Sequence, residues 1–147
     1  ILENECQGAY DELDKLREVA KGVKMKVILE TGELETVFKI RRASEVAIRA
    51  GADFLKTSTG KLKPTATSED LLIMLDTIKE YHEKTGKMIG VKPSGGISTP
   101  DDALKYFVLV KEVLGDKWLN NKYFRIGASK LAYKIFSEIK ELQDQAG

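Results

Sequence analysis

Three lysines stand in short apolar segments of this 147-residue chain, and the middle one has the surroundings of a nucleophile. Lys56 follows Ala52, Phe54 and Leu55, so its side chain is expected to leave a buried strand. Burial disfavours the charged ammonium, and an amine that is partly neutral near pH 7 can attack a carbonyl to form a Schiff base. A lysine whose ammonium simply extends to water is the commoner arrangement. The interpretation of Lys56 as the nucleophile therefore depends on the residues around it.

Lys92 and Lys26 supply that context, because each lies in another short apolar segment. Adjacent strands of a sheet lie ~5 Å apart, so Lys56 and Lys92 would repel each other if they faced the same side. Repulsion together with burial lowers the pKa of one amine and leaves the other as a cation. The sequence does not say which of the two is which.

Three short turns rich in glycine and hydroxyl groups follow the apolar segments. Backbone amides in such turns can surround a phosphate, and the start of a helix adds a favourable dipole. A single turn of this kind is usually no more than a turn, whereas three that converge predict a phosphorylated substrate. The candidate phosphate-binding residues are Gly60, Lys61, Gly95, Gly96, Ser98, Gly127 and Ser129.

The hydrophobic periodicity predicts the elements that position these residues. Helices are expected over 8–20, 37–50, 67–86, 99 onward and 131–142, and strands over 25–31, 53 onward, 88–93 and 123–126. Lys26, Ile28 and Glu30 are expected on one face of the first strand. Pro93 should stand at the end of the third, where the missing N–H does least harm.

This order, one helix followed by four strand-helix units, predicts a single α/β domain over residues 1–147. The turns at the carboxyl ends of parallel strands should surround one site. Four units are half of a (β/α)₈ TIM barrel, so the chain is either the C-terminal half of such a barrel or a small open doubly wound sheet. The first residue, Ile1, is not a methionine, which favours a truncated barrel.

The charge balance gives no sign of a bulk anionic partner, because 24 basic and 23 acidic residues are interspersed along the chain. We therefore expect no nucleic acid and no membrane as partner. No apolar run approaches the ~20 residues of a membrane span. The single cysteine, Cys6, cannot form an internal disulfide, which fits a reducing compartment and predicts a cytoplasmic protein.

Four motifs together resemble the deoxyribose-phosphate aldolases: KVILETGEL at 26–34, FLKTSTGK at 54–61, VKPSGGI at 91–97 and FRIGAS at 124–129. The resemblance runs from about Tyr10 to Leu142. It implies a (β/α)₈ barrel and a class I aldolase, a carbon–carbon lyase of carbohydrate degradation that uses a lysine amine, with no metal and no cofactor. The implied reaction is the reversible cleavage of 2-deoxy-D-ribose 5-phosphate to D-glyceraldehyde 3-phosphate and acetaldehyde, so a small phosphorylated sugar and an aldehyde are the implied partners.

The resemblance also implies a role for each site residue. Lys56 would form the Schiff base, Lys92 would be the neighbouring cation that perturbs it, and Lys26 would line the site. Many members have arginine where Ser98 stands and a second serine where Lys130 stands. Our hypothesis is that Lys130 supplies the missing charge, and an unchanged Michaelis constant in Lys130→Ala would contradict it.

One group that the family uses has no counterpart in the sequence. The family transfers protons with an aspartate on the fourth barrel strand, which would precede Ile1. We therefore expect the chain by itself to be inactive or nearly so unless it pairs with the missing half. An open half barrel would also expose strand edges, so we expect a homo-oligomer or association through those edges.

Two other classes of function stay open. A different phosphosugar enzyme on the same barrel, such as an isomerase or epimerase, would need a carboxylate or histidine base at a strand end, and only Glu30 and Glu33 offer one. A non-catalytic half barrel or open α/β binding module is the third class. The lysines on adjacent strands favour the aldolase for the parent protein. For the chain in isolation, the aldolase is favoured over the third class by a smaller margin.

Overall fold

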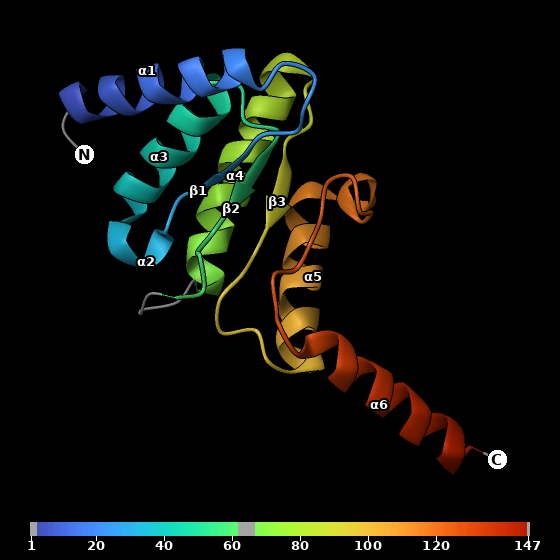
Figure 1. Ribbon diagram of the computed structural model, residues 1–147. Helices are drawn as coiled ribbons and strands as arrows, with labels where there is room; N and C mark the ends of the chain where they lie inside the picture. Colours follow the sequence, from blue (N-terminus) through green and yellow to red (C-terminus); the bar gives the residue numbers. More distant parts are fainter. Residues whose placement is uncertain (1–2, 62–66, 147) are drawn as a thin grey trace.

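A small parallel sheet is the centre of the computed structural model, which describes residues 3–61 and 67–146 (Figure 1). Its strands are short and lie in the order β1 (Lys26–Ile28), β2 (Phe54–Lys56) and β3 (Gly90–Lys92). The remaining elements are α1 (Glu3–Val19), α2 (Thr31–Leu34), α3 (Val37–Arg49), α4 (Ser68–Thr85), α5 (Pro100–Leu114), the 3₁₀ turn η1 (Asp116–Trp118) and α6 (Leu131–Gln145). The structure is thus an α/β fold in which helices connect parallel strands.

The apolar core lies between one face of the sheet and the helices. Leu55 and Val91, the middle residues of β2 and β3, are fully buried among side chains of α3, α4 and α5. Because side chains alternate along a strand, the residues on either side of them face the opposite way. The helices pack in sequence, α1 on α3, α3 on α4 and α4 on α5, along the covered face (Figure 1). The other face of the sheet carries the lysines.

Capping boxes fix the starts of α4 and α5, the helices that follow β2 and β3. The hydroxyl of Thr67 accepts a hydrogen bond from the Asp70 amide, and the Asp70 carboxylate accepts one from the Thr67 amide. Thr99 and Asp102 repeat the arrangement at α5, with Pro100 in the first turn. The predicted helix starts at 67 and 99 are confirmed.

The first strand is shorter than predicted, and one of its expected residues is not on it. The prediction of a strand over 25–31 was wrong beyond Ile28, because Thr31 already begins α2. Glu30 adopts the left-handed conformation, with φ of 52°, and so does not share a face with Lys26 and Ile28. Its carboxylate instead accepts hydrogen bonds from the Thr59 amide, at 3.2 and 3.1 Å. The chain thus leaves the extended conformation at Glu30, directly before α2 begins.

The predicted fourth strand, 123–126, is an extended segment that pairs with β3 without forming a regular strand. It makes two isolated parallel bridges, Val91 with Phe124 and Ser94 with Gly127. The Val91 amide donates to the Tyr123 carbonyl at 2.7 Å, and the Arg125 amide donates to the Val91 carbonyl at 3.1 Å. The prediction was correct in the position and the parallel direction of the segment. It was wrong in expecting a continuous strand, because only isolated bridges form. Over the described ranges the segment pairs on one side only.

The two terminal helices are longer than predicted. Helix α1 begins at Glu3 rather than Gly8, and α6 continues to Gln145. Helix α6 projects from the body of the molecule (Figure 1). Leu131 is its only buried residue among those described. None of the helices in residues 3–61 and 67–146 is long and apolar enough to cross a membrane.

Candidate active site

The register of the sheet brings the lysines together on its open face. Lys56 pairs directly with Lys92 across β2 and β3, and with Ile28 on the other side. Lys26 lies at the start of β1, opposite Phe54. Lys56 and Lys92 are partly buried, whereas Lys26 is exposed. Two lysines therefore occupy paired positions at the carboxyl ends of adjacent parallel strands.

The pKa of Lys92 lies below the ordinary lysine value. Burial is the largest cause, followed by the positive charges of Lys26, Lys56 and Arg125. Each of these disfavours a further ammonium in the same place. Burial and repulsion thus act on Lys92, the residue that the resemblance makes the neighbouring cation.

A pocket of about 420 Å³ opens beside Lys56 at the ends of the strands. Its walls are the three glycine turns, and the lining residues are Lys56, Thr59, Gly60, Ser94, Gly95, Gly96, Ile97, Gly127, Ala128 and Ser129. Segments far apart in the sequence thus meet at one cavity, as the parallel topology requires. No carboxylate is among these lining residues, and none of the described residues forms a group of three potential metal ligands.

Four predicted site residues do not line this pocket: Lys26, Lys61, Lys92 and Ser98. The Ser98 amide and hydroxyl both donate to the Asp102 carboxylate, at 3.1 and 3.4 Å. The Ser98 amide, with the Thr99 cap, lowers the pKa of Asp102, so Ser98 belongs to the start of α5. The Lys61 amide donates to the Thr59 hydroxyl at 3.3 Å, and Lys130 is the exposed N-cap residue of α6.

Glycine at position 127 keeps two other parts of the site in place. A Cβ atom there would lie 2.5 Å from the Cβ of Ser94 and 3.0 Å from the Cε of Lys92. The side chain of Lys92 thus runs past Gly127 in space that a larger residue would fill. The glycine turn and the position of the second amine are consequently linked.

Buried hydroxyl groups tie the turns to one another, and the sequence analysis did not single them out. The Thr57 hydroxyl donates to the Ser94 carbonyl at 3.0 Å and accepts from the Ser94 amide at 2.9 Å. The Ser94 hydroxyl donates to the Ser58 carbonyl. The sequence feature that could have indicated these bonds is the presence of hydroxyl residues just after the strands that carry Lys56 and Lys92. These bonds fix the pocket wall beside Lys56.

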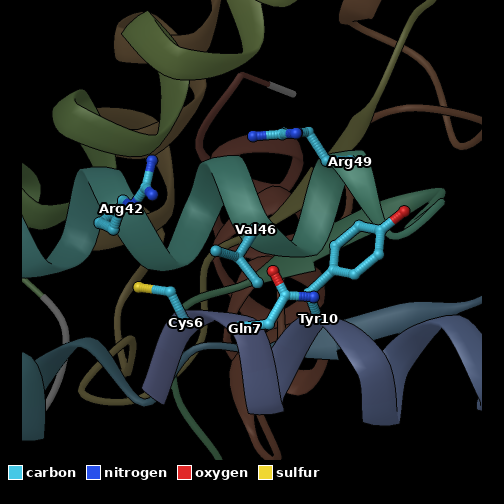
Figure 2. Close-up of a pocket in the computed structure, with 6 residues that line it drawn as sticks. All are labelled: Cys6, Gln7, Tyr10, Arg42, Val46 and Arg49. Atoms are coloured by element: carbon cyan, nitrogen blue, oxygen red, sulfur yellow. The ribbon is translucent and has the colours of Figure 1, made fainter. Parts of the chain in front are cut away.

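A second pocket, of about 310 Å³, lies between α1 and α3 and is lined by Cys6, Gln7, Tyr10, Arg42, Val46 and Arg49 (Figure 2). Cys6 is buried and is not part of a disulfide. Its thiol is the main cause that raises the pKa of Arg42, and Glu45 adds to it. This pocket lies between two helices and away from the strand ends, so it contributes nothing to the arrangement of amines.

Comparison with known proteins identifies a related family. A profile of the DeoC/LacD family aldolases matches residues 2–110. The chain is 48% identical over 130 residues to a putative deoxyribose-phosphate aldolase of Caenorhabditis elegans, covering 88% of this chain and 43% of that protein. It is 44% identical over 139 residues to the deoxyribose-phosphate aldolase of Homo sapiens, covering 95% of this chain and 44% of that protein.

The fold is similar to solved structures of the same kind. The apo form of a putative deoxyribose-phosphate aldolase from Toxoplasma gondii superimposes with a TM-score of 0.82 at 25% identity. The match covers 92% of this chain and 54% of that one. The chain therefore spans less than half the length of the curated relatives given above and about half of this solved structure.

Proposed function

Because the chain belongs to the DeoC/LacD family of aldolases, we propose that it carries the Schiff-base site of a deoxyribose-phosphate aldolase. The reaction is the reversible cleavage of 2-deoxy-D-ribose 5-phosphate to D-glyceraldehyde 3-phosphate and acetaldehyde, a step of carbohydrate degradation. The observation that carries this proposal is the pairing of Lys56 with Lys92 beside the glycine-walled pocket.

Lys56 is the nucleophile in this proposal because it is the amine that lines the pocket. Its neutral form attacks the aldehyde carbon of the open-chain sugar, and loss of water gives an iminium ion. A base removes the proton of the C3 hydroxyl, the C2–C3 bond breaks, and its electron pair neutralises the iminium to an enamine. Protonation of the enamine carbon and addition of water then release acetaldehyde and the free amine.

Lys92 and Lys26 act on this amine through their charges. A neighbouring cation makes a second ammonium in the same place unfavourable, which favours the neutral form that attacks. Lys92 lies directly opposite Lys56, and Lys26 lies on the next strand with its side chain exposed to the open face. We assign Lys92 as the perturbing cation and Lys26 as a residue that lines the substrate path.

The substrate phosphate is proposed to bind at the glycine turns. Gly60, Gly95, Gly96, Gly127 and Ser129 meet around the pocket, where backbone amides can donate to phosphate oxygens. Lys61 and Ser98 adjoin these turns and are proposed to act at the rim. The pocket lies next to Lys56, so a bound phosphate would hold the other end of the sugar near the amine.

A (β/α)₈ barrel in a single domain is the architecture proposed for the whole site. The parallel order β1-β2-β3, with segment 123–127 beside β3, supports four consecutive barrel positions. No carboxylate lines the pocket, so the group that moves the proton of the C3 hydroxyl is proposed to come from another part of the barrel. The single cysteine is consistent with a reducing compartment, and we propose the cytoplasm.

An isomerase or epimerase on the same scaffold is less well supported. Such an enzyme needs a free base at a strand end. The Glu30 carboxylate is engaged with the Thr59 amide, and Glu33 is exposed on α2. The two candidate bases are thus used in the fold or turned to solvent.

Borohydride trapping tests the proposal directly. The protein at its full natural length is treated with borohydride in the presence of acetaldehyde or 2-deoxy-D-ribose 5-phosphate, and the reduced adduct is mapped by peptide mass spectrometry. We expect a single adduct on Lys56. We also expect Lys56→Met to abolish the adduct and to lower kcat/KM about a thousandfold or more.

The matched control is Lys79→Met, which removes an exposed lysine on the far side of α4. It should trap and cleave substrate like the wild type. An adduct at another lysine would reassign the nucleophile, and the absence of any adduct in the wild-type protein would refute the aldolase proposal.

A further inference from the structure

A fourth cation, Arg125, lies on the open face of the sheet and is held in a defined position there. Its guanidinium carbon lies 4.7 Å from the centre of the Phe54 ring, within the range of a cation–π interaction. Its Nε donates a hydrogen bond of 3.0 Å to the Asn121 carbonyl. The first contact is to β2, and the second is to the turn that precedes Arg125 in the chain. The guanidinium is therefore held by two different parts of the structure.

The register explains how Arg125 reaches Phe54 across the strand between them. The bridge of Val91 with Phe124 puts Arg125 beside Lys92 on the same face. Phe54 pairs with Gly90, and a Cβ atom at that glycine would lie 2.5 Å from the ring. The ring therefore occupies the space above Gly90. The guanidinium of Arg125, in segment 123–127, packs over the same ring.

This arrangement forms a layer directly beneath the two amines. Phe54 and Lys56 are two residues apart on β2, and so are Gly90 and Lys92 on β3, which separates the layers by about 7 Å. A guanidinium stays charged at every pH at which a protein is folded, whereas the lysine charges titrate. Arg125 is therefore the one permanent charge among the groups that act on Lys92, which besides burial are Lys26, Lys56 and Arg125.

We propose that Arg125 is a positioning residue, a fixed cation that sets the charge state of the Lys56–Lys92 pair and, with it, the pH range of Schiff-base formation. The second part rests on the proposed aldolase function. The first part concerns the amines alone and can be measured whatever the protein catalyses.

The test compares two neutral variants, Arg125→Met and Arg125→Gln, with the charge-retaining Arg125→Lys. The Lys92 amine is titrated by trace acylation at a series of pH values, with its modification read by peptide mass spectrometry. Loss of a neighbouring positive charge favours the ammonium. We therefore expect the midpoint to rise by about half a pH unit in both neutral variants and to stay near the wild-type value in Arg125→Lys.

The second readout is the pH dependence of borohydride trapping and of kcat/KM. The acid limb should move to higher pH by the same half unit in the neutral variants, which is about a threefold loss on that limb and none above it. Far-UV circular dichroism and thermal unfolding monitor the fold of each variant. Two neutral replacements of different shape guard against a packing defect in one of them.

Three outcomes separate the proposals. An unchanged Lys92 midpoint in folded neutral variants overturns the role of Arg125. A uniform loss of rate with an unshifted pH profile also overturns it, since that is the result of a merely structural residue. A shifted Lys92 midpoint in a protein that never forms an adduct supports the electrostatic role and refutes the aldolase function instead.

Discussion

Lys92 carries a charge that opposes folding. Its pKa in the folded chain lies below the ordinary value of 10.5, because burial and three neighbouring cations disfavour the ammonium. When pH is below the folded pKa, the residue is protonated in both states and the full cost is present. As pH rises toward 10.5 the folded state releases its proton first, so stability increases and the cost disappears. A residue kept at a cost to stability is typical of a functional site.

Lys92→Met should therefore stabilise the protein at neutral pH. After allowance for screening by solvent, we expect a gain of about 0.5 kcal/mol in the free energy of unfolding. The gain should shrink as the pH approaches 10.5, because the wild type then loses the charge as well. Urea unfolding at several pH values measures both effects. Lys79→Met is the control, since its lysine is exposed on α4 and its removal should change stability very little. A destabilised Lys92→Met at pH 7 would contradict the argument.

Among the elements, β3 has little room for added volume at its first residue. Gly90 begins β3, and a Cβ atom there would lie 2.5 to 2.7 Å from three carbons of the Phe54 ring. The ring is itself buried and packs against Arg125, so it has little room to move. An alanine at this position must displace the ring, the guanidinium or the strand.

We expect Gly90→Ala to lower the free energy of unfolding by about 1–3 kcal/mol, the usual cost of overpacking. The same substitution at Gly8 is the matched control. Gly8 lies within α1 with no atom within 4 Å of an added Cβ, and alanine there should stabilise the helix by about 0.5–1 kcal/mol. Chemical denaturation of the two variants gives the comparison. Equal effects of the two changes would show that the Phe54 ring adapts without cost.

Local sequence patterns were sufficient to locate most elements. The capping residues Thr67 and Thr99, with Asp70 and Asp102 three positions later, determined two helix starts because the bonds involved span only one turn. The limits of β1 were not predictable in this way. The extended run stops at the left-handed Glu30, whose carboxylate accepts from the Thr59 amide, 29 positions away.

The site was predictable to the same extent. Glycine after each strand was enough to indicate the pocket, whereas the shared face of Lys56 and Lys92 was only a supposition until the register paired them. The stacking of Arg125 on Phe54 was not, since it requires the register of two segments that are not neighbours in the chain or in the sheet. The motif FRIGAS, which contains Arg125, was part of the family resemblance, but no role was assigned to the arginine.

For the molecule as a whole, the surface of α6 is the feature that the described fold leaves unexplained. The helix projects from the body (Figure 1). It exposes large apolar side chains, with Tyr133 79%, Phe136 69% and Leu142 65% accessible. Leu104 and Val108 are exposed on α5 as well. Apolar patches of this kind mark surfaces that other protein covers.

We expect this chain, when expressed alone, to self-associate through the apolar face of α6. Sedimentation velocity should show particles larger than one chain of 147 residues at micromolar concentration. Phe136→Asp puts a charge into the exposed face and should shift the distribution toward the monomer, because burying that carboxylate in an apolar contact costs several kcal/mol. Glu141→Gln, an exposed polar change on the same helix, should leave the distribution as it is. A monomeric wild-type chain would show that α6 needs no partner, and an associated Phe136→Asp variant would move the contact to the open edges of the sheet.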